Sequence, residues 1–229
     1  MRLQKLTETN ILSVNKMSTL YHYVHCPYCI RVRMTLAFLD ENYRDQVLQY
    51  DDESTPLKLT GVKMLPIWQD KSGKAMNESL DIIKHLDKDN RIPALKQADN
   101  EELENWLSKL GSNVHNLAMP YWVWTPEFKE SSRNYFEAKK SKKRGPFKEL
   151  AKNRNHFEEQ IIKDLKYFES NLTPWYKSEE FTLADIMVAA HLWGLFVVPE
   201  FRFSDKMHSY LMAVKSKTKF DYHAPFWAN

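Results

Sequence analysis

The chain has 229 residues, of which 43% are hydrophobic, so it can form one large domain or two modest ones. Its formal net charge of +3 does not require a nucleic acid partner, and no stretch reaches the ~20 apolar residues of a membrane span. Two cysteines and no continuous apolar segment near the start predict a cytoplasmic protein with no membrane association.

Residues 1–16 carry no clear pattern and are expected to be an N-terminal extension. A β-branched and aromatic run at 19–24 predicts a strand, and apolar residues at helical spacing predict a helix from Pro27 to about Leu39. Further along we expect a strand at 44–49, a short helix ending at Gly61, a hairpin of strands at 63–68 and 74–76, and a helix at 79–86. The order βαβαββα predicts a small mixed sheet covered by helices over residues 17–87.

Residues 88–99 are polar, contain Pro93 and are expected to be a linker. From 100 to 229 only helical periodicity is visible, which predicts an all-helical C-terminal domain. The apolar stripes of three of its helices are Leu103, Trp106, Leu107, Leu110, Val114 and Leu117; Phe157, Ile161, Leu165 and Phe168; and Met207, Tyr210, Leu211 and Val214. The prolines expected at helix boundaries are Pro120, Pro126, Pro146, Pro174 and Pro199. Thr182 and Asp185 predict a capping box at the start of an apolar, buried helix.

Both cysteines lie in the run Cys26-Pro27-Tyr28-Cys29, at the junction of the first strand and the first helix. Pro27 fits the first helical position, so Cys26 is expected at the N-cap and Cys29 one turn later, where the two sulfurs can meet. Free amides and the helix dipole favour a negative sulfur at Cys26. A reversible dithiol with a Cys26 thiolate is therefore the leading hypothesis.

Two other interpretations of the cysteine pair remain open at this point. A purely structural disulfide would close so short a loop that it would add only roughly 2 kcal/mol of stability. A structural zinc site needs four nitrogen or sulfur ligands, and the cysteine pair supplies two. Because His22 and His25 precede the pair and the other histidines are scattered, we expect no metal.

Three runs together resemble the bacterial glutaredoxin 2 family: Tyr21 to Cys29, Val62 to Ile67, and Met76 to Ile82. The resemblance extends from about Met17 to near the C-terminus. It implies an α/β thioredoxin-like N-terminal domain followed by an all-α C-terminal domain, in a glutathione S-transferase-like architecture. It also implies glutathione-dependent reduction of protein disulfides and protein-glutathione mixed disulfides by Cys26 and Cys29. The implied partners are glutathione, as reducing co-substrate, and disulfide-bearing or glutathionylated proteins. The family favours a monomer, whereas the wider transferase fold favours a dimer.

The same resemblance assigns Leu65 and Pro66 to the glutathione site. Their peptide bond is expected to be cis, which would turn the backbone of Leu65 toward the cysteinyl part of glutathione. An ordinary proline at the edge of a strand is the alternative. Tyr28 is expected to shape the same groove, although an aromatic ring there could merely shield the sulfurs.

Glu78 and Ser79 are expected to begin a helix whose free amides, with the Ser79 hydroxyl, hold the γ-glutamyl carboxylate of glutathione. Plain N-capping by Asn77 or Ser79 is the alternative. Where many small glutaredoxins carry a lysine, this chain has Tyr23, Val24 and His25. His25 is expected either to assist Cys26 when protonated or to point into solvent.

Two further functional hypotheses follow from the helical half. A cysteine-type glutathione transferase or dehydroascorbate reductase would need a hydrophobic second-substrate pocket, with Trp122, Trp124 and Trp193 as candidate walls. A binding module for RNA or an acidic protein would use the basic run at 139–144. The alternative interpretation of that run is a solvated, exposed turn before Pro146.

Overall fold

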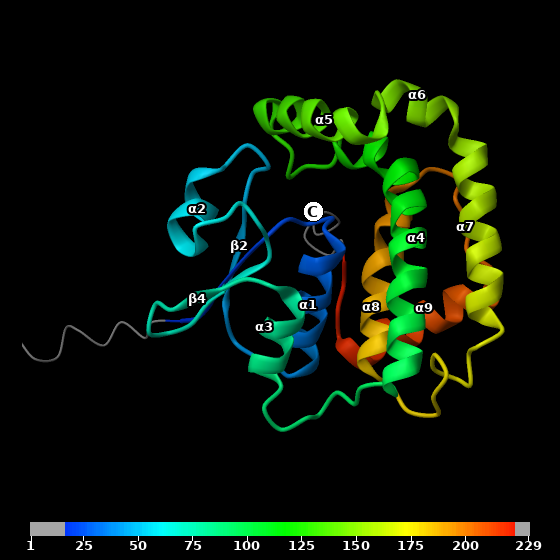
Figure 1. The fold of residues 1–229 in the computed structure, drawn as a ribbon, viewed down its shortest axis with the longest axis horizontal. Coiled ribbons are helices and arrows are strands. Elements are labelled where there is room, and N and C mark those ends of the chain that lie inside the picture. Colours follow the sequence, from blue (N-terminus) through cyan, green and yellow to red (C-terminus); the bar gives the residue numbers. More distant parts are fainter. Residues whose placement is uncertain (1–16, 223–229) are drawn as a thin grey trace, which may run out of the picture.

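The computed structural model describes residues 17–222, so the predicted extension at 1–16 lies outside the described residues. The N-terminal elements are β1 (Thr19–His22), α1 (Pro27–Phe38), β2 (Arg44–Val47), α2 (Ser54–Thr60), β3 (Ile67–Gln69), β4 (Ala75–Met76) and α3 (Ser79–Leu86). This is the predicted order, with strands shorter than expected. The described residues form one four-stranded sheet in the order β2-β1-β3-β4, with β1 parallel to β2 and antiparallel to β3 (Figure 1).

Apolar residues pack α1 and α3 onto one face of this sheet, while α2 lies on the other side (Figure 1). The cluster between α1, α3 and the sheet consists of Leu20, Val32, Leu36, Trp68, Ile82 and Ile83. Its residues come from the central strands and from two helices, so burial of their apolar surface fixes where α1 begins relative to the end of β1. The loop that carries Cys26 is positioned by this packing.

The rest of the described chain is helical: α4 (Gln97–Trp122), α5 (Glu130–Arg144), α6 (Phe147–Lys152), α7 (Arg154–Glu169), α8 (Leu183–Leu192), the 3-10 helix η1 (Trp193–Val197) and α9 (Asp205–Thr218). The predicted apolar stripes lie on α4, α7 and α9 and contribute to one large core. Helix α4 begins inside the stretch expected as a linker at 88–99. Among the described residues, no helix combines the length and hydropathy that crossing a bilayer requires.

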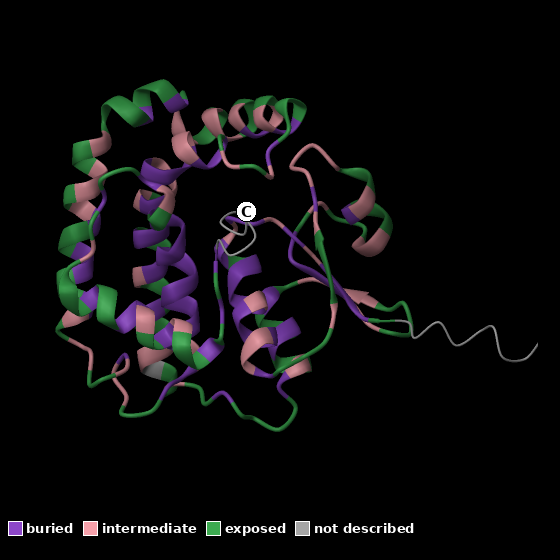
Figure 2. Cartoon of the chain, turned by 180° about the vertical axis from the view of Figure 1, so that it is seen from behind, coloured by how far each residue is buried: buried purple, intermediate pink, exposed green. Residues whose placement is uncertain are grey.

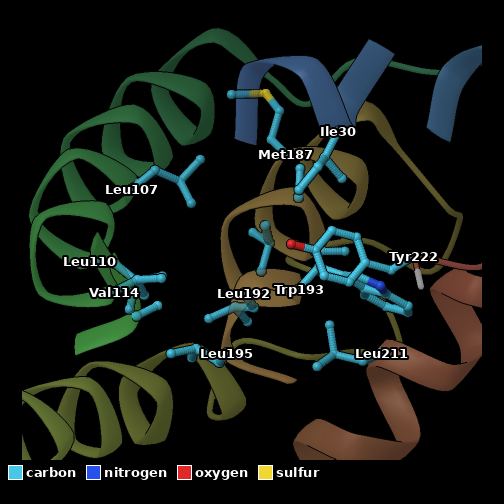
Figure 3. Packing of buried hydrophobic residues seen from close by; sticks show 14 of the residues in the cluster. Ile30, Leu107, Leu110, Val114, Met187, Leu192, Trp193, Leu195, Leu211 and Tyr222 are labelled. Carbon is cyan, nitrogen blue, oxygen red and sulfur yellow. The ribbon is translucent and has the colours of Figure 1, made fainter. Parts of the chain in front are cut away.

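The two parts of the molecule meet where α1 packs against α8. Ile30 and Met34 of α1 belong to the large cluster of the helical part. Figure 3 shows Ile30 beside Met187 of α8. Helix α8 is buried almost throughout its length, as Figure 2 shows. Helix α1 is therefore packed on both sides, and the position of Cys26 depends on both domains.

The predicted capping box at the start of α8 is confirmed. Asp185 accepts a hydrogen bond from the Thr182 amide at 2.8 Å, and the Thr182 side chain accepts from the amide of Asp185. Asp185 also accepts from the Tyr176 amide at 3.0 Å and from the Tyr210 hydroxyl at 2.8 Å. This carboxylate ties the start of α8 to α9 and to the loop before α8.

The prediction that Pro120 marks a helix boundary is wrong, since α4 continues through it to Trp122. A proline in a helix removes one backbone hydrogen bond, and here that loss falls in the last turn, where few such bonds follow. Pro126, Pro146, Pro174 and Pro199 do lie outside the described α-helices.

The end of α4 is held by a close contact between Trp122 and Gly194. Trp122 Nε1 donates to the Gly194 carbonyl at 3.1 Å, and a Cβ at position 194 would lie 2.6 Å from Trp122 Cζ2. We expect Gly194→Ala to destabilise the protein by about 1–3 kcal/mol in urea unfolding, because the indole has to move. The same change should cost less in a Trp122→Phe background. An equal cost in both backgrounds would contradict this explanation.

Candidate functional site

Cys26 and Cys29 lie at the N-terminus of α1 as the sequence predicts. Cys26 is the N-cap in an extended conformation, Pro27 is the first helical residue, and the amides of Cys29 and Ile30 both donate to the Cys26 carbonyl at 2.9 Å. The two cysteines are free thiols 3.6 Å apart. Cys26 is partly exposed and Cys29 is fully buried, so only Cys26 is open to a substrate.

The pKa values of the two thiols are shifted in opposite directions. A hydrogen bond from the Cys29 thiol, together with the amides of Cys29 and Tyr28 and the charge of Arg31, lowers the pKa of Cys26 to about 7 against the opposing effect of burial. Burial raises the pKa of Cys29 well above its usual value, and the neighbouring Cys26 raises it further. Cys26 is therefore partly ionised at neutral pH, and Cys29 remains protonated.

Alkylation of Cys26 by iodoacetamide is expected to follow an apparent pKa near 7. Cys29→Ala should move this pKa upward, because the Cys29 thiol makes the largest contribution to lowering it. The measurement is the pH dependence of the rate at Cys26, followed by mass spectrometry of the modified peptide. A profile that matches free cysteine would contradict the assignment of Cys26 as the ionised nucleophile.

A cavity of about 320 Å³ opens beside Cys26, with walls from both domains. Of the predicted site residues, Cys26, Tyr28 and Leu65 line it. The other lining residues are Tyr23, His25, Pro27, Tyr50, Lys63, Met64, His115, Met119, Trp122, Tyr135, Phe136, Lys139, Lys140 and Arg144. Cys29 lies beneath this surface, in a small cluster with Leu48 and Leu65. The peptide bond between Leu65 and Pro66 is cis, as the family resemblance implies, and Pro66 itself does not line the cavity.

Glu78 and Ser79 lie at the start of α3, outside the cavity of Cys26. Glu78 is the N-cap with φ 71°, Ser79 is the buried first residue, and no side chain caps the helix. Simple capping by Asn77 or Ser79 is therefore wrong for this structure. A second cavity of about 270 Å³ lies next to this helix start, lined by Tyr28, Arg31, Leu80, Glu104, Leu107, Ser108, Met187 and His191. Tyr28 borders both cavities.

His25 does not point into solvent, contrary to one of the two expectations from the sequence. Its side chain is buried at the domain interface. The ring contacts the Tyr222 hydroxyl through Nδ1, and through Nε2 it contacts Thr125 Oγ1 at 2.8 Å and the Glu127 carboxylate. His25 thus connects the loop before Cys26 to the segment that follows α4. No local sequence signal reveals this role, because its partners lie about 100 or more residues further along the chain.

The basic run at 139–144 is not a turn, since it forms the end of α5. Lys139, Lys140 and Arg144 line the cavity of Cys26. Lys63 and Tyr135 also line this cavity, although no sequence pattern indicated them as site residues. Only the packing of α5 over the N-terminal domain brings the α5 side chains to this cavity, whereas Lys63 belongs to the N-terminal domain itself.

The three tryptophans suggested as pocket walls lie in different places. Trp122 lines the cavity of Cys26. Trp193 is buried in the helical core among Phe196, Phe220 and Tyr222, and Trp124 is 71% exposed. The cavity therefore has one tryptophan wall, not three. Within residues 17–222 there is no group of three or more histidine, cysteine, aspartate or glutamate side chains that could hold a metal ion.

Comparison with known proteins identifies the family. The family model for the glutaredoxin 2 C-terminal domain matches residues 102–224, and the model for the glutathione S-transferase N-terminal domain matches residues 20–97. Glutaredoxin 2 of Escherichia coli strain K12 is 33% identical over 150 residues, which covers 64% of this chain and 70% of that protein. The chain belongs to the glutaredoxin 2 family. This membership makes it a glutathione-dependent oxidoreductase enzyme.

Solved structures support the same fold. The glutaredoxin 2 of Salmonella typhimurium, solved in complex with glutathione, matches with a TM-score of 0.81 and 26% identity, over 91% of this chain and 97% of that one. A glutathione transferase from Phanerochaete chrysosporium matches with a TM-score of 0.73 and 16% identity, over 90% and 98% of the two chains, and this likeness concerns the fold alone. The expected thioredoxin-like domain followed by a helical domain is thereby confirmed.

Proposed function

We propose that this glutaredoxin 2 family member reduces protein disulfides and protein-glutathione mixed disulfides through Cys26 and Cys29, with glutathione as the reductant. The observation that carries the proposal is the unequal pair of thiols at the start of α1. Cys26 is partly exposed with a pKa of about 7, and the buried Cys29 lies 3.6 Å away. An accessible thiolate beside a protonated thiol suits thiol-disulfide exchange.

In the first step the Cys26 thiolate attacks a sulfur of the substrate disulfide, so that a Cys26–sulfur bond forms as the substrate S–S bond breaks. The sulfur that leaves takes a proton and becomes a thiol. With a glutathionylated substrate the product is a Cys26–glutathione disulfide, which a second glutathione thiolate cleaves to give glutathione disulfide. With a protein disulfide, Cys29 loses its proton and attacks the Cys26 sulfur, so that the Cys26–Cys29 bond forms as the Cys26–substrate bond breaks and the second substrate sulfur leaves as a thiol. Two glutathiones later reduce the Cys26–Cys29 bond and are released as glutathione disulfide.

Three features support a glutathione site along Tyr28, Leu65 and the start of α3. Leu65 lines the cavity next to Cys26, where its backbone can pair with the cysteinyl part of the tripeptide. The first amides of α3 have no capping side chain and can donate hydrogen bonds to a carboxylate. Arg31 is buried and its Nε has no hydrogen-bond partner among the described residues, so it adds positive charge in the adjoining cavity.

The remaining parts of the proposal concern the cellular location, the oligomeric state and the substrates. We place the protein in the cytoplasm, where its thiols would remain reduced, and we propose that it acts as a monomer on disulfide-bearing or glutathionylated proteins. The rival function of a transferase or dehydroascorbate reductase requires a hydrophobic second-substrate pocket. The observed cavity has apolar walls, for example Met119, Trp122 and Phe136, as well as a basic wall from α5. Comparing turnover of a small electrophile with turnover of a glutathionylated protein therefore tests this rival.

The proposal is tested by trapping the intermediate. Cys29→Ser protein mixed with a glutathionylated peptide should accumulate a Cys26–glutathione disulfide, which intact-mass spectrometry detects and excess glutathione removes. The Cys26→Ser variant is the matched control and should form no adduct. Failure of the Cys29→Ser protein to form the adduct would overturn the proposed function.

A further inference from the structure

The cavity beside Cys26 has an excess of positive charge that the exchange of thiols and disulfides does not itself require. Four cationic side chains line it, namely Lys63, Lys139, Lys140 and Arg144, and its lining contains no aspartate or glutamate. Three of the four come from α5, which lies above the N-terminal domain in Figure 1. Because like charges gathered in one cavity repel, such a wall is stabilised when a bound anion neutralises it.

Two of the four cations already have partners. Lys63 Nζ donates to the Tyr50 carbonyl at 2.7 Å and contacts the Glu53 carboxylate at 3.2 Å, so its charge is neutralised within the fold. Lys139 is exposed and contacts the Tyr135 hydroxyl at 3.1 Å. These two lysines therefore contribute less to binding an anion.

Arg144 and Lys140 differ from Lys63 and Lys139 in the contacts that they make. Arg144 Nη1 is held by the Asn116 side chain at 2.7 Å and the Ser112 carbonyl at 3.2 Å, contacts that orient the guanidinium without cancelling its charge. Lys140 is partly buried, with Nζ 5.5 Å from the centre of the Phe136 ring, and forms no ion pair with a described carboxylate. Burial lowers the pKa of Lys140, and attraction to the Cys26 thiolate opposes this effect.

Stabilising the Cys26 thiolate accounts for Lys140 only in part. The acidity of Cys26 comes chiefly from the Cys29 thiol, backbone amides and Arg31. A partly buried ammonium group that lines the same cavity as Cys26, with no carboxylate partner among the described residues, is suited to a carboxylate that the substrate brings.

We propose that Lys140, supported by Arg144, forms a carboxylate subsite for the disulfide substrate, and that this enzyme prefers substrates with an aspartate or glutamate near the reacting cysteine. The inference rests on the proposed function, because it assumes that the substrate disulfide is attacked by Cys26. It deepens that function by defining the class of protein substrate. A substrate carboxylate could contact Lys140 Nζ while the neighbouring sulfur lies at Cys26, since both residues line one cavity.

The test compares two glutathionylated peptides that differ only in glutamate or glutamine beside the cysteine. Wild-type enzyme is expected to show about tenfold higher kcat/KM for the glutamate peptide, the size of effect expected for a charged hydrogen bond. In the Lys140→Gln variant, the kcat/KM values for the two peptides should become nearly equal. Lys142→Gln is the matched control: it removes the same charge from the same helix, but Lys142 is exposed and does not line the cavity. It should retain the ratio.

Other outcomes separate the two proposals. If the wild type reduces both peptides at equal rates, or if Lys140→Gln slows both equally, the acidic-substrate preference is overturned while the oxidoreductase function stands. An equal slowing would mean that Lys140 acts on glutathione or on Cys26, and glutathione KM and the pH profile of alkylation distinguish these two. If the wild type reduces neither peptide, the proposed function itself fails.

Discussion

Replacing Cys26 with serine is expected to abolish glutathione-coupled reduction of every disulfide substrate, whereas Cys29→Ser should retain reduction of glutathionylated proteins and lose the dithiol route. Cys26 is the accessible thiol and has a pKa of about 7, while a serine hydroxyl stays protonated at neutral pH. Cys29 is buried, so we expect it to act on Cys26 and not directly on a substrate. A glutathione molecule can replace it only when the intermediate is a mixed disulfide with glutathione.

The measurement is steady-state turnover with glutathione and glutathione reductase, using one glutathionylated protein and one protein with an intramolecular disulfide. Circular dichroism and urea unfolding of both variants verify that the fold is intact. The scheme is wrong if both single variants keep full activity on both substrates. It is also wrong if Cys29→Ser loses activity on the glutathionylated protein while remaining folded.

Asp185→Ala is expected to destabilise the protein by about 3–5 kcal/mol, the largest stability effect that we predict. The change leaves four donors without their acceptor: the Tyr176 amide, the Thr182 amide and hydroxyl, and the Tyr210 hydroxyl. Each unpaired buried donor costs roughly 1–3 kcal/mol. Burial raises the pKa of Asp185, so removing the carboxyl group recovers some desolvation cost, but the lost hydrogen bonds outweigh it.

Urea unfolding measures this effect, and Asp205→Ala provides the matched control. Asp205 also lies in the first turn of a helix, α9, but it is exposed, so its loss should cost no more than about 1 kcal/mol. Equal costs for the two variants would show that the buried network around Asp185 does not hold α8 in place. Because α8 packs against α1, a large loss at Asp185 would also loosen the helix that carries Cys26.

Much of the N-terminal domain is predictable because its signals are local. Pro27 at a helix start, Gly61 at a helix end with φ 77°, and the position of Ser79 all follow from backbone chemistry within a few residues. The N-cap position of Cys26 follows from the same chemistry. The apolar stripes of α4, α7 and α9 are predictable for the related reason that a helix repeats every 3.6 residues.

The errors concern positions whose role depends on distant parts of the chain. Nothing near His25 in sequence indicates that Thr125 and Glu127 enclose it, and nothing in the run at 139–144 indicates that Cys26 lies opposite. Pro120 has the local chemistry of a helix boundary, yet α4 continues for two more residues to Trp122, which packs on Gly194.

The amino-acid sequence by itself determined the cysteine pair at the start of the first helix, the order of the elements and the division into a mixed α/β part and a helical part. These properties depend on neighbouring residues, on periodicity and on caps. The tertiary structure alone decided which side chains surround Cys26, because the docking of α8 on α1 and the placement of α5 join residues more than 100 positions apart. The burial of apolar surface between the domains determines which side chains line the cavity opposite Cys26, and no local pattern encodes that arrangement.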